Sequence, residues 1–79
     1  MTNTVIIDFD RFDRWKKDSG IETDAEICRK AGLHGAAIKH LRTGYRRLSI
    51  KVVTGLYEWY GIPFDPKDPN SFYRYDDKQ

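Results

Sequence analysis

Apolar residues recur with helical spacing near the start of the chain. Phe9, Phe12 and Trp15 lie three positions apart, with polar residues between them, and this spacing predicts a first helix. Asp8 or Asp10 can cap its start, because an aspartate oxygen accepts hydrogen bonds from the free backbone N–H groups there. Basic residues gather toward its end, where the helix dipole favours them.

Two shorter helices are predicted next. Thr23 and Glu26 have the spacing of a capping box, so a second helix starts at Asp24. Gly32 ends that helix, because glycine allows the left-handed backbone of a sharp turn. The inward face of the second helix is expected to carry Ile27, Cys28 and Ala31.

A third helix is predicted from about Gly35 to Arg42, with Ile38 and Leu41 facing inward. Ser49 can cap a fourth helix that reaches Tyr60. The second and third helices, joined by a tight glycine turn, have the pattern of a helix-turn-helix. In such a motif the first helix and the corner hold the second helix at a fixed angle, so that it can enter a major groove.

The predicted fourth helix is apolar on two sides. One stripe consists of Ile50, Val53, Tyr57 and Tyr60. The other consists of Val52, Leu56 and Trp59. A helix that is apolar on two sides usually buries both. The second stripe is therefore either a wider contact with the core or a surface for a dimer or another partner.

The sequence allows more than one structure for each end of the chain. Residues 4–7 are apolar and β-branched and can form a short strand or an ordered lead-in. Prolines at 63, 66 and 69 favour an extended arm, and the aromatic alternation of residues 71–75 can form a strand against residues 4–7 or against a second subunit. We therefore expect an all-α, four-helix domain over residues 1–62 and an extended C-terminal arm over residues 63–79, with a short terminal strand pairing left open.

Composition narrows the class of protein. Seventy-nine residues make one small domain and leave no room for a second, catalytic one. The start of the chain lacks the features of a signal peptide, and no apolar run reaches half a membrane span, so we expect a cytoplasmic protein with no membrane partner. Cys28 is the one cysteine, which excludes an intramolecular disulfide and leaves too few sulfur ligands for a structural zinc site.

The basic residues are concentrated in the middle of the chain. Residues 29–57 carry seven basic and no acidic side chains, whereas both flanking segments are net acidic. Such a block, placed over a helix-turn-helix, is typical of a surface that meets phosphates. A merely solvated basic face is the alternative.

No catalytic or metal site is predicted. The aspartates at 8, 10 and 13 lack a histidine or a phosphate loop near them in sequence and are better explained as a helix start. His34 and His40 are six residues apart, which does not place them on one helix face as metal ligands. Cys28 lies at an inward position, as a small buried hydrophobe would. We expect neither an enzyme nor a cofactor.

With these elements placed, residues from about Phe9 to Asp65 resemble the lambda-repressor-like DNA-binding domains of the Cro and phage-repressor (XRE-type) family. Gly32 and Leu33 match the turn glycine and the apolar residue that follows it in the family. The matched inward positions on the second and third helices are Ile27, Cys28, Ala31, Ile38 and Leu41. The exit is matched by Gly44, Arg46 and the Ser49 helix, and residues 56–62 match the family's apolar ending.

The chain departs from the family on the side that would face DNA. Asp24 stands where the family often has a phosphate-binding Gln, and an acid there repels a phosphate at close range. His34, Gly35 and Ala36 replace the polar residues that usually enter the groove first. Base reading by this chain is therefore expected to be sparse, with DNA shape more important.

The resemblance and the basic block together imply a sequence-specific double-stranded-DNA-binding transcriptional regulator, a prokaryotic or phage-type repressor related to Cro, acting as a homodimer. Its predicted DNA-binding residues are His34, Gly35, Ala36, Ala37, Lys39, His40, Arg42, Thr43, Tyr45, Arg46 and Arg47. The alternative is a protein-binding modulator, such as an antirepressor or antitoxin, that keeps the fold and contacts a second regulatory protein.

Overall fold

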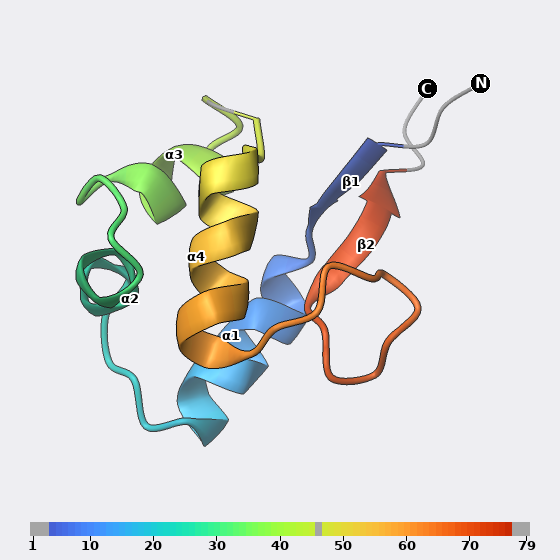
Figure 1. Cartoon of the computed structure of the whole chain (residues 1–79), viewed down its shortest axis with the longest axis horizontal. Helices are drawn as coiled ribbons and strands as arrows, with labels where there is room; N and C mark the ends of the chain where they lie inside the picture. Colours follow the sequence, from blue (N-terminus) through green and yellow to red (C-terminus); the bar gives the residue numbers. More distant parts are fainter. Residues whose placement is uncertain (1–3, 46, 77–79) are drawn as a thin grey trace.

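Four helices and a two-stranded antiparallel sheet make up the described part of the chain. The computed structural model describes residues 4–45 and 47–76. The elements follow in the order β1 (Thr4–Ile7), α1 (Phe9–Asp18), α2 (Asp24–Lys30), α3 (Ala37–Arg42), α4 (Ile50–Tyr60) and β2 (Tyr73–Asp76). Figure 1 shows α2 and α3 on the left, the two strands on the right, and α4 in the centre, where it passes in front of α1.

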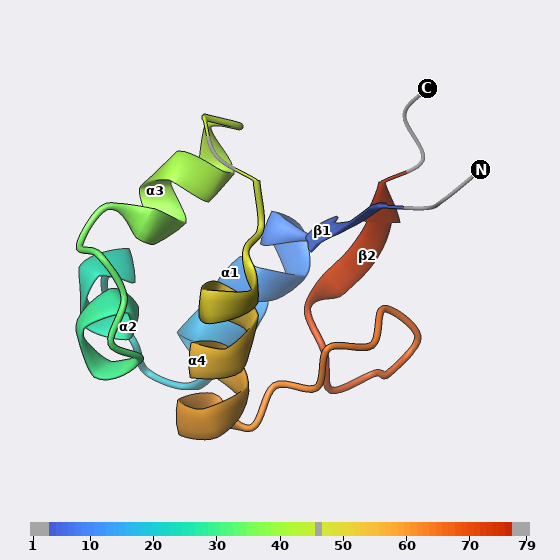
Figure 2. The same ribbon diagram turned by 45° about the horizontal axis from the view of Figure 1, so that its top comes forward.

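The expected all-α class is wrong, because the fold is mixed. β1 pairs with β2, from Thr4 opposite Asp76 to Ile7 opposite Tyr73, so the strand pairing that the sequence left open is present. The first and last described segments of the chain lie side by side in both views (Figures 1 and 2). The sheet thereby closes the chain onto itself.

The expected extended arm is also wrong, because the chain folds back after α4. Asp65 and Asp68 each accept a hydrogen bond from a backbone N–H two residues later, and each begins a turn whose second residue is a proline. Aspartate followed by proline is a common start of a tight turn. Two such turns bring residues 71–73 back to α1. The prolines at 66 and 69 therefore belong to turns and not to an extended arm.

The helix starts lie where the capping residues predict them. Asp8, Thr23 and Ser49 each accept a hydrogen bond from a backbone N–H in the first turn of the following helix. α4 ends at Gly61, whose φ of 67° is in the left-handed region. No helix in the ranges 4–45 and 47–76 is long and apolar enough to cross a membrane.

One core joins all six elements. Its buried side chains are Ile7, Phe12, Ile27, Cys28, Ile38, Val52, Leu56, Ile62, Phe72 and Tyr73. Phe72 and Tyr73, from the segment expected to be an arm, are among the largest fully buried side chains. Phe72 packs edge-on against Phe12 of α1, with ring centroids 4.9 Å apart. The C-terminal segment is therefore part of the core that supports the helices.

Helix α4 passes very close to the end of α2 at Gly55. A Cβ atom added there would lie 2.8 Å from the carbonyl oxygen of Ala31 and 3.2 Å from its Cβ. We expect Gly55→Ala to destabilise the fold by about 1–3 kcal/mol through overpacking, although alanine has the better helix propensity by about 1 kcal/mol. Urea unfolding measures this change, with the exposed neighbour Thr54→Ala as control. A Gly55→Ala variant more stable than wild type would contradict the close contact.

The hydroxyl of Tyr73 is buried, and among the described residues it has no hydrogen-bond partner. Burial also raises the pKa of this phenol above its ordinary value. Because an unpaired buried hydroxyl costs free energy, we expect Tyr73→Phe to raise the free energy of unfolding by about 1 kcal/mol. Tyr75→Phe, on the same face of β2 but only half-buried, should change it little. A loss of stability in Tyr73→Phe would show that the hydroxyl is paired in solution.

Candidate nucleic-acid interface

The turn between α2 and α3 is held by local hydrogen bonds. Gly32 has a φ of 72°, and the N–H of Leu33 then donates to the carbonyl of Cys28 at 2.7 Å. The Nδ1 atom of His34 accepts from the N–H of Ala36 at 3.2 Å. These contacts keep residues 34–36 in a turn, so α3 begins at Ala37 rather than at the expected Gly35.

Arg42, at the end of α3, is held by two carboxylates. Its Nε and Nη2 atoms donate to Asp24 at 2.7 and 3.1 Å, and its Nη1 atom donates to Asp13 at 3.1 Å. The guanidinium also lies over the rings of Phe9 and Phe12, 4.6 and 5.3 Å from their centroids. One side chain of α3 thus binds both α1 and α2.

The charge of Asp24 is therefore compensated within the protein. Its Oδ1 also accepts from Lys16 at 3.0 Å. Burial by itself raises the pKa of Asp24, but hydrogen bonds from Arg42 and Lys16 lower it below the ordinary value of 3.8. The bond to Asp24, followed by that to Asp13, raises the pKa of Arg42. Arg42 therefore links α3 to α1 and α2, and its predicted contact with a phosphate stays a prediction.

The outward side of α3 carries polar and aromatic groups. Lys39 and Tyr45 are exposed, and Thr43 donates its hydroxyl proton to the carbonyl of His40. The rings of His34 and His40 are nearly parallel, with centroids 6.4 Å apart, and Tyr45 lies 5.0 Å from His40. The rings of His34, His40 and Tyr45 therefore lie together at the outward side of α3, with Thr43 bonded to the His40 backbone.

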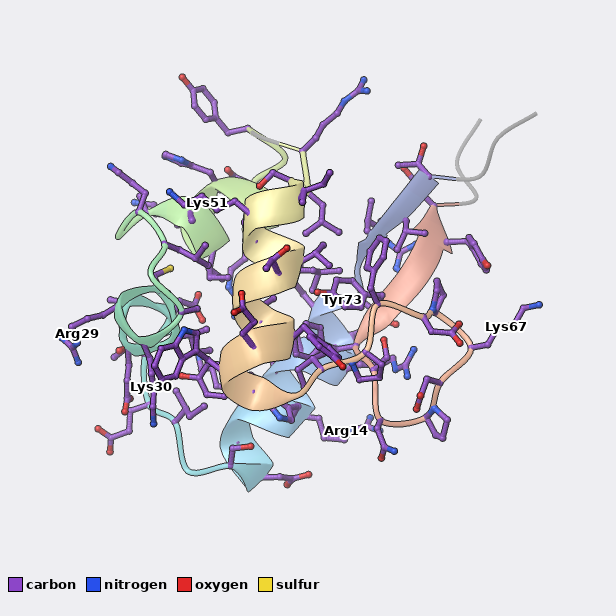
Figure 3. All side chains as sticks on the ribbon, in the orientation of Figure 1. Arg14, Arg29, Lys30, Lys51, Lys67 and Tyr73 are labelled. Atoms are coloured by element: carbon purple, nitrogen blue, oxygen red, sulfur yellow. The ribbon has the colours of Figure 1, made fainter. Side chains whose placement is uncertain are left out.

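A groove of about 460 Å³ separates α3 from the start of α4. His34, His40, Arg47 and Lys51 contribute its polar wall, and Lys51 points from the first turn of α4 toward α3 in Figure 3. Its apolar floor consists of Leu33, Ala37, Leu41 and Val52. Sequence reasoning missed Lys51, although it belongs to the same basic block.

The basic block does not gather on a single face. Lys30 lies over the ring of Tyr60, 6.0 Å from its centroid, and Arg29 projects from α2 away from α4 (Figure 3). Of the remaining predicted residues, Gly35 is exposed and Ala36 is half-buried in the turn. Arg46 lies outside the described residues. Among the described residues, the exposed cations around α3 that hold no carboxylate are therefore Lys39, Arg47 and Lys51.

The predicted partner stripe on α4 lies mostly inside the protein. Val52 and Leu56 are buried in the core, because α4 turns that side toward α1 and α2. Of the stripe, Trp59 remains 60% exposed. Ile50 and Tyr57, which the sequence placed on the other stripe, are 84% and 61% exposed. The expectation of a partner surface on Val52 and Leu56 is corrected accordingly.

Comparison with known proteins returns nothing: no family model, no curated protein and no solved structure matches the chain.

The Asp24 ion pairs make the stability depend on pH in a defined direction. Because folding lowers the pKa of Asp24, its contribution is complete above 3.8, its ordinary pKa, and is lost as the pH falls through the lowered value. We expect Asp24→Asn to reduce the free energy of unfolding by about 1 kcal/mol at pH 7. As the pH falls below 3.8, the difference in free energy of unfolding between Asp24→Asn and wild type should shrink.

Urea unfolding at several pH values measures both effects. Asp18→Asn, which removes an exposed carboxyl at the end of α1, is the matched control and should follow wild type throughout. A difference between Asp24→Asn and wild type that does not change with pH would contradict the ionic origin of the contribution.

Proposed function

We propose that the chain is a sequence-specific double-stranded-DNA-binding regulator that presents the outward face of α3 to the major groove. The observation that carries the proposal is the grouping of Lys39, Arg47 and Lys51 around α3, in a segment without a single acid from residue 29 to 57. Cations grouped beside a short exposed helix match the charge and width of a major groove.

The geometry of α3 allows only a few direct contacts with DNA bases. Its six residues give a length of about 9 Å at a rise of 1.5 Å per residue, shorter than the groove is wide. Lys39, His40 and Thr43 are the polar side chains that would approach bases or nearby phosphates. Ala37 lines the protein groove between α3 and α4, and its short side chain offers little for contacts with bases. Specificity would then depend strongly on DNA shape.

The resemblance to the Cro and phage-repressor family supports this function, and it implies a cytoplasmic homodimer on a two-fold symmetric site. Two recognition helices would lie about 34 Å apart, one turn of the duplex. Trp59, Tyr57 and Ile50 are the exposed apolar residues of α4 available for contact between subunits.

Selection of bound sequences from a random duplex pool, followed by a salt titration of the winner, tests the proposal. With three phosphates neutralised per subunit by Lys39, Arg47 and Lys51, log affinity should fall against log salt with a slope of about −3 per subunit. Lys39→Gln and Lys51→Gln should each reduce the steepness of that slope by about 1.

Lys67→Gln is the matched control, because Lys67 projects from the loop between α4 and β2, far from α3 (Figure 3). It should leave both affinity and slope unchanged. Failure to enrich any sequence, or equal effects of the three substitutions, would reject the DNA interface and favour the alternative of a protein-binding modulator.

A further inference from the structure

The two edges of the sheet differ in how their backbone groups are used. The N–H of Asp8 donates to the carbonyl of Phe72 at 2.8 Å, directly after the pair Ile7 and Tyr73. In an antiparallel ladder, hydrogen-bonded and non-hydrogen-bonded pairs alternate. Ile7 and Tyr73 are therefore a non-hydrogen-bonded pair, and their backbone groups point away from each other.

The same alternation applies one step along the strands. Val5, opposite Tyr75, also directs its N–H and C=O away from β2, whereas Ile6 is paired with Arg74 through hydrogen bonds. The outer edge of β1 thus presents the backbone groups of Val5 and Ile7. The outer edge of β2 presents those of Tyr73 and Tyr75.

The outer edge of β2 is closed at Tyr73. The N–H of Tyr73 donates to the hydroxyl of Ser71 at 3.0 Å, and its carbonyl accepts from Arg11 at 2.8 Å. Arg11 also donates to the carbonyl of Asp68 at 3.1 Å, which fixes the guanidinium beside the strand. Another strand cannot pair at Tyr73 without displacing these groups.

The outer edge of β1 opens instead on a groove. The groove has a volume of about 580 Å³ and runs between β1 and the connection from α3 to α4. Its apolar lining includes Phe9, Leu41 and Leu48, all of which pack on the core. An open strand edge beside an apolar groove is the geometry that accepts an added peptide strand.

The charges at the groove indicate the chemistry of that strand. Arg47 and Arg74 line it and are exposed, and within the described residues neither forms an ion pair. Arg42 also lines it but already holds two carboxylates. With Asp76 as the one acidic side chain in the lining, the groove keeps a positive charge.

We propose that β1 and this groove bind an extended, acidic segment of a partner protein as a third strand. The alternation of side chains along the sheet sets its pattern. Val5 and Ile7 share the inward face with Tyr73, whereas Ile6 and Arg74 share the outward face. The segment therefore alternates apolar residues, which face Leu41 and Leu48, with carboxylates on the outward side near Arg74. The proposal does not rest on DNA binding by α3, although Arg47 lines both this groove and the groove between α3 and α4.

Hydrogen exchange of the intact protein tests the pairing directly. The probe is the hexapeptide (Val-Glu)3, acetylated and amidated, with (Val-Lys)3 as control. At ten times its dissociation constant, (Val-Glu)3 should slow exchange of the Val5 and Ile7 amides about tenfold. The amide of Ile6, already bonded to β2, should change little. No slowing at Val5 and Ile7 with millimolar peptide would overturn the proposal.

The backbone contribution is tested with methylated peptides. Methylating the N–H groups of alternate residues gives two versions of (Val-Glu)3, of which one removes the hydrogen bonds to β1 and the other leaves them. The version without hydrogen bonds to β1 should lose binding, and the version that keeps them should still bind. Equal binding by both versions would overturn strand addition.

Charge substitutions test the class of partner. Arg74→Glu should weaken (Val-Glu)3 at least tenfold and allow (Val-Lys)3 to bind, whereas Lys67→Glu, outside the groove, should do neither. Slow exchange of Val5 and Ile7 that already exists in the free protein and grows with protein concentration would assign the edge to a second copy. Slowing of exchange at the Val5 and Ile7 amides by duplex DNA in place of the peptide would assign the edge to nucleic acid. Either result would overturn the proposal.

Discussion

The placement of α3 depends on the ion pairs of Arg42 with Asp13 and Asp24. These three charges come from three helices, and the rings of Phe9 and Phe12 lie under the guanidinium. Because the fork of an arginine bonds two carboxylates in a fixed geometry, it sets an angle as well as a distance. Helix α3 also buries Ile38 in the core. The ion pairs therefore act together with this apolar packing in setting how the outer face of α3 is presented.

The helices could be predicted because their signals are local. Caps at Asp8, Thr23 and Ser49 and inward residues such as Ile27 and Ile38 act within one or two turns, where spacing reports contact. The role of Arg42 could not be predicted, because it depends on carboxylates 18 and 29 residues away. An acid at position 24 looks unfavourable for phosphate binding in the sequence. Its role becomes clear only when the structure shows that it pairs with Arg42.

The fold of the C-terminal segment was predicted wrongly for a different reason. Prolines every third residue suit an extended arm, but the aspartates before two of them form turns with the same spacing. Aromatic residues beyond those turns then meet α1, and Phe72 and Tyr73 fill the core. Sequence spacing did not distinguish these outcomes, since burial of a distant segment is decided by the space that the helices leave.

The sheet has a consequence for the order of events during synthesis. β1 is made about seventy residues before its partner β2, so their pairing closes the longest loop among the described elements. A nascent chain carries α3 and the basic residues around it well before Phe72 and Tyr73 leave the ribosome. The helices therefore remain without part of their core until β2 has been made, and the mature surface is presented only by molecules whose synthesis has passed β2.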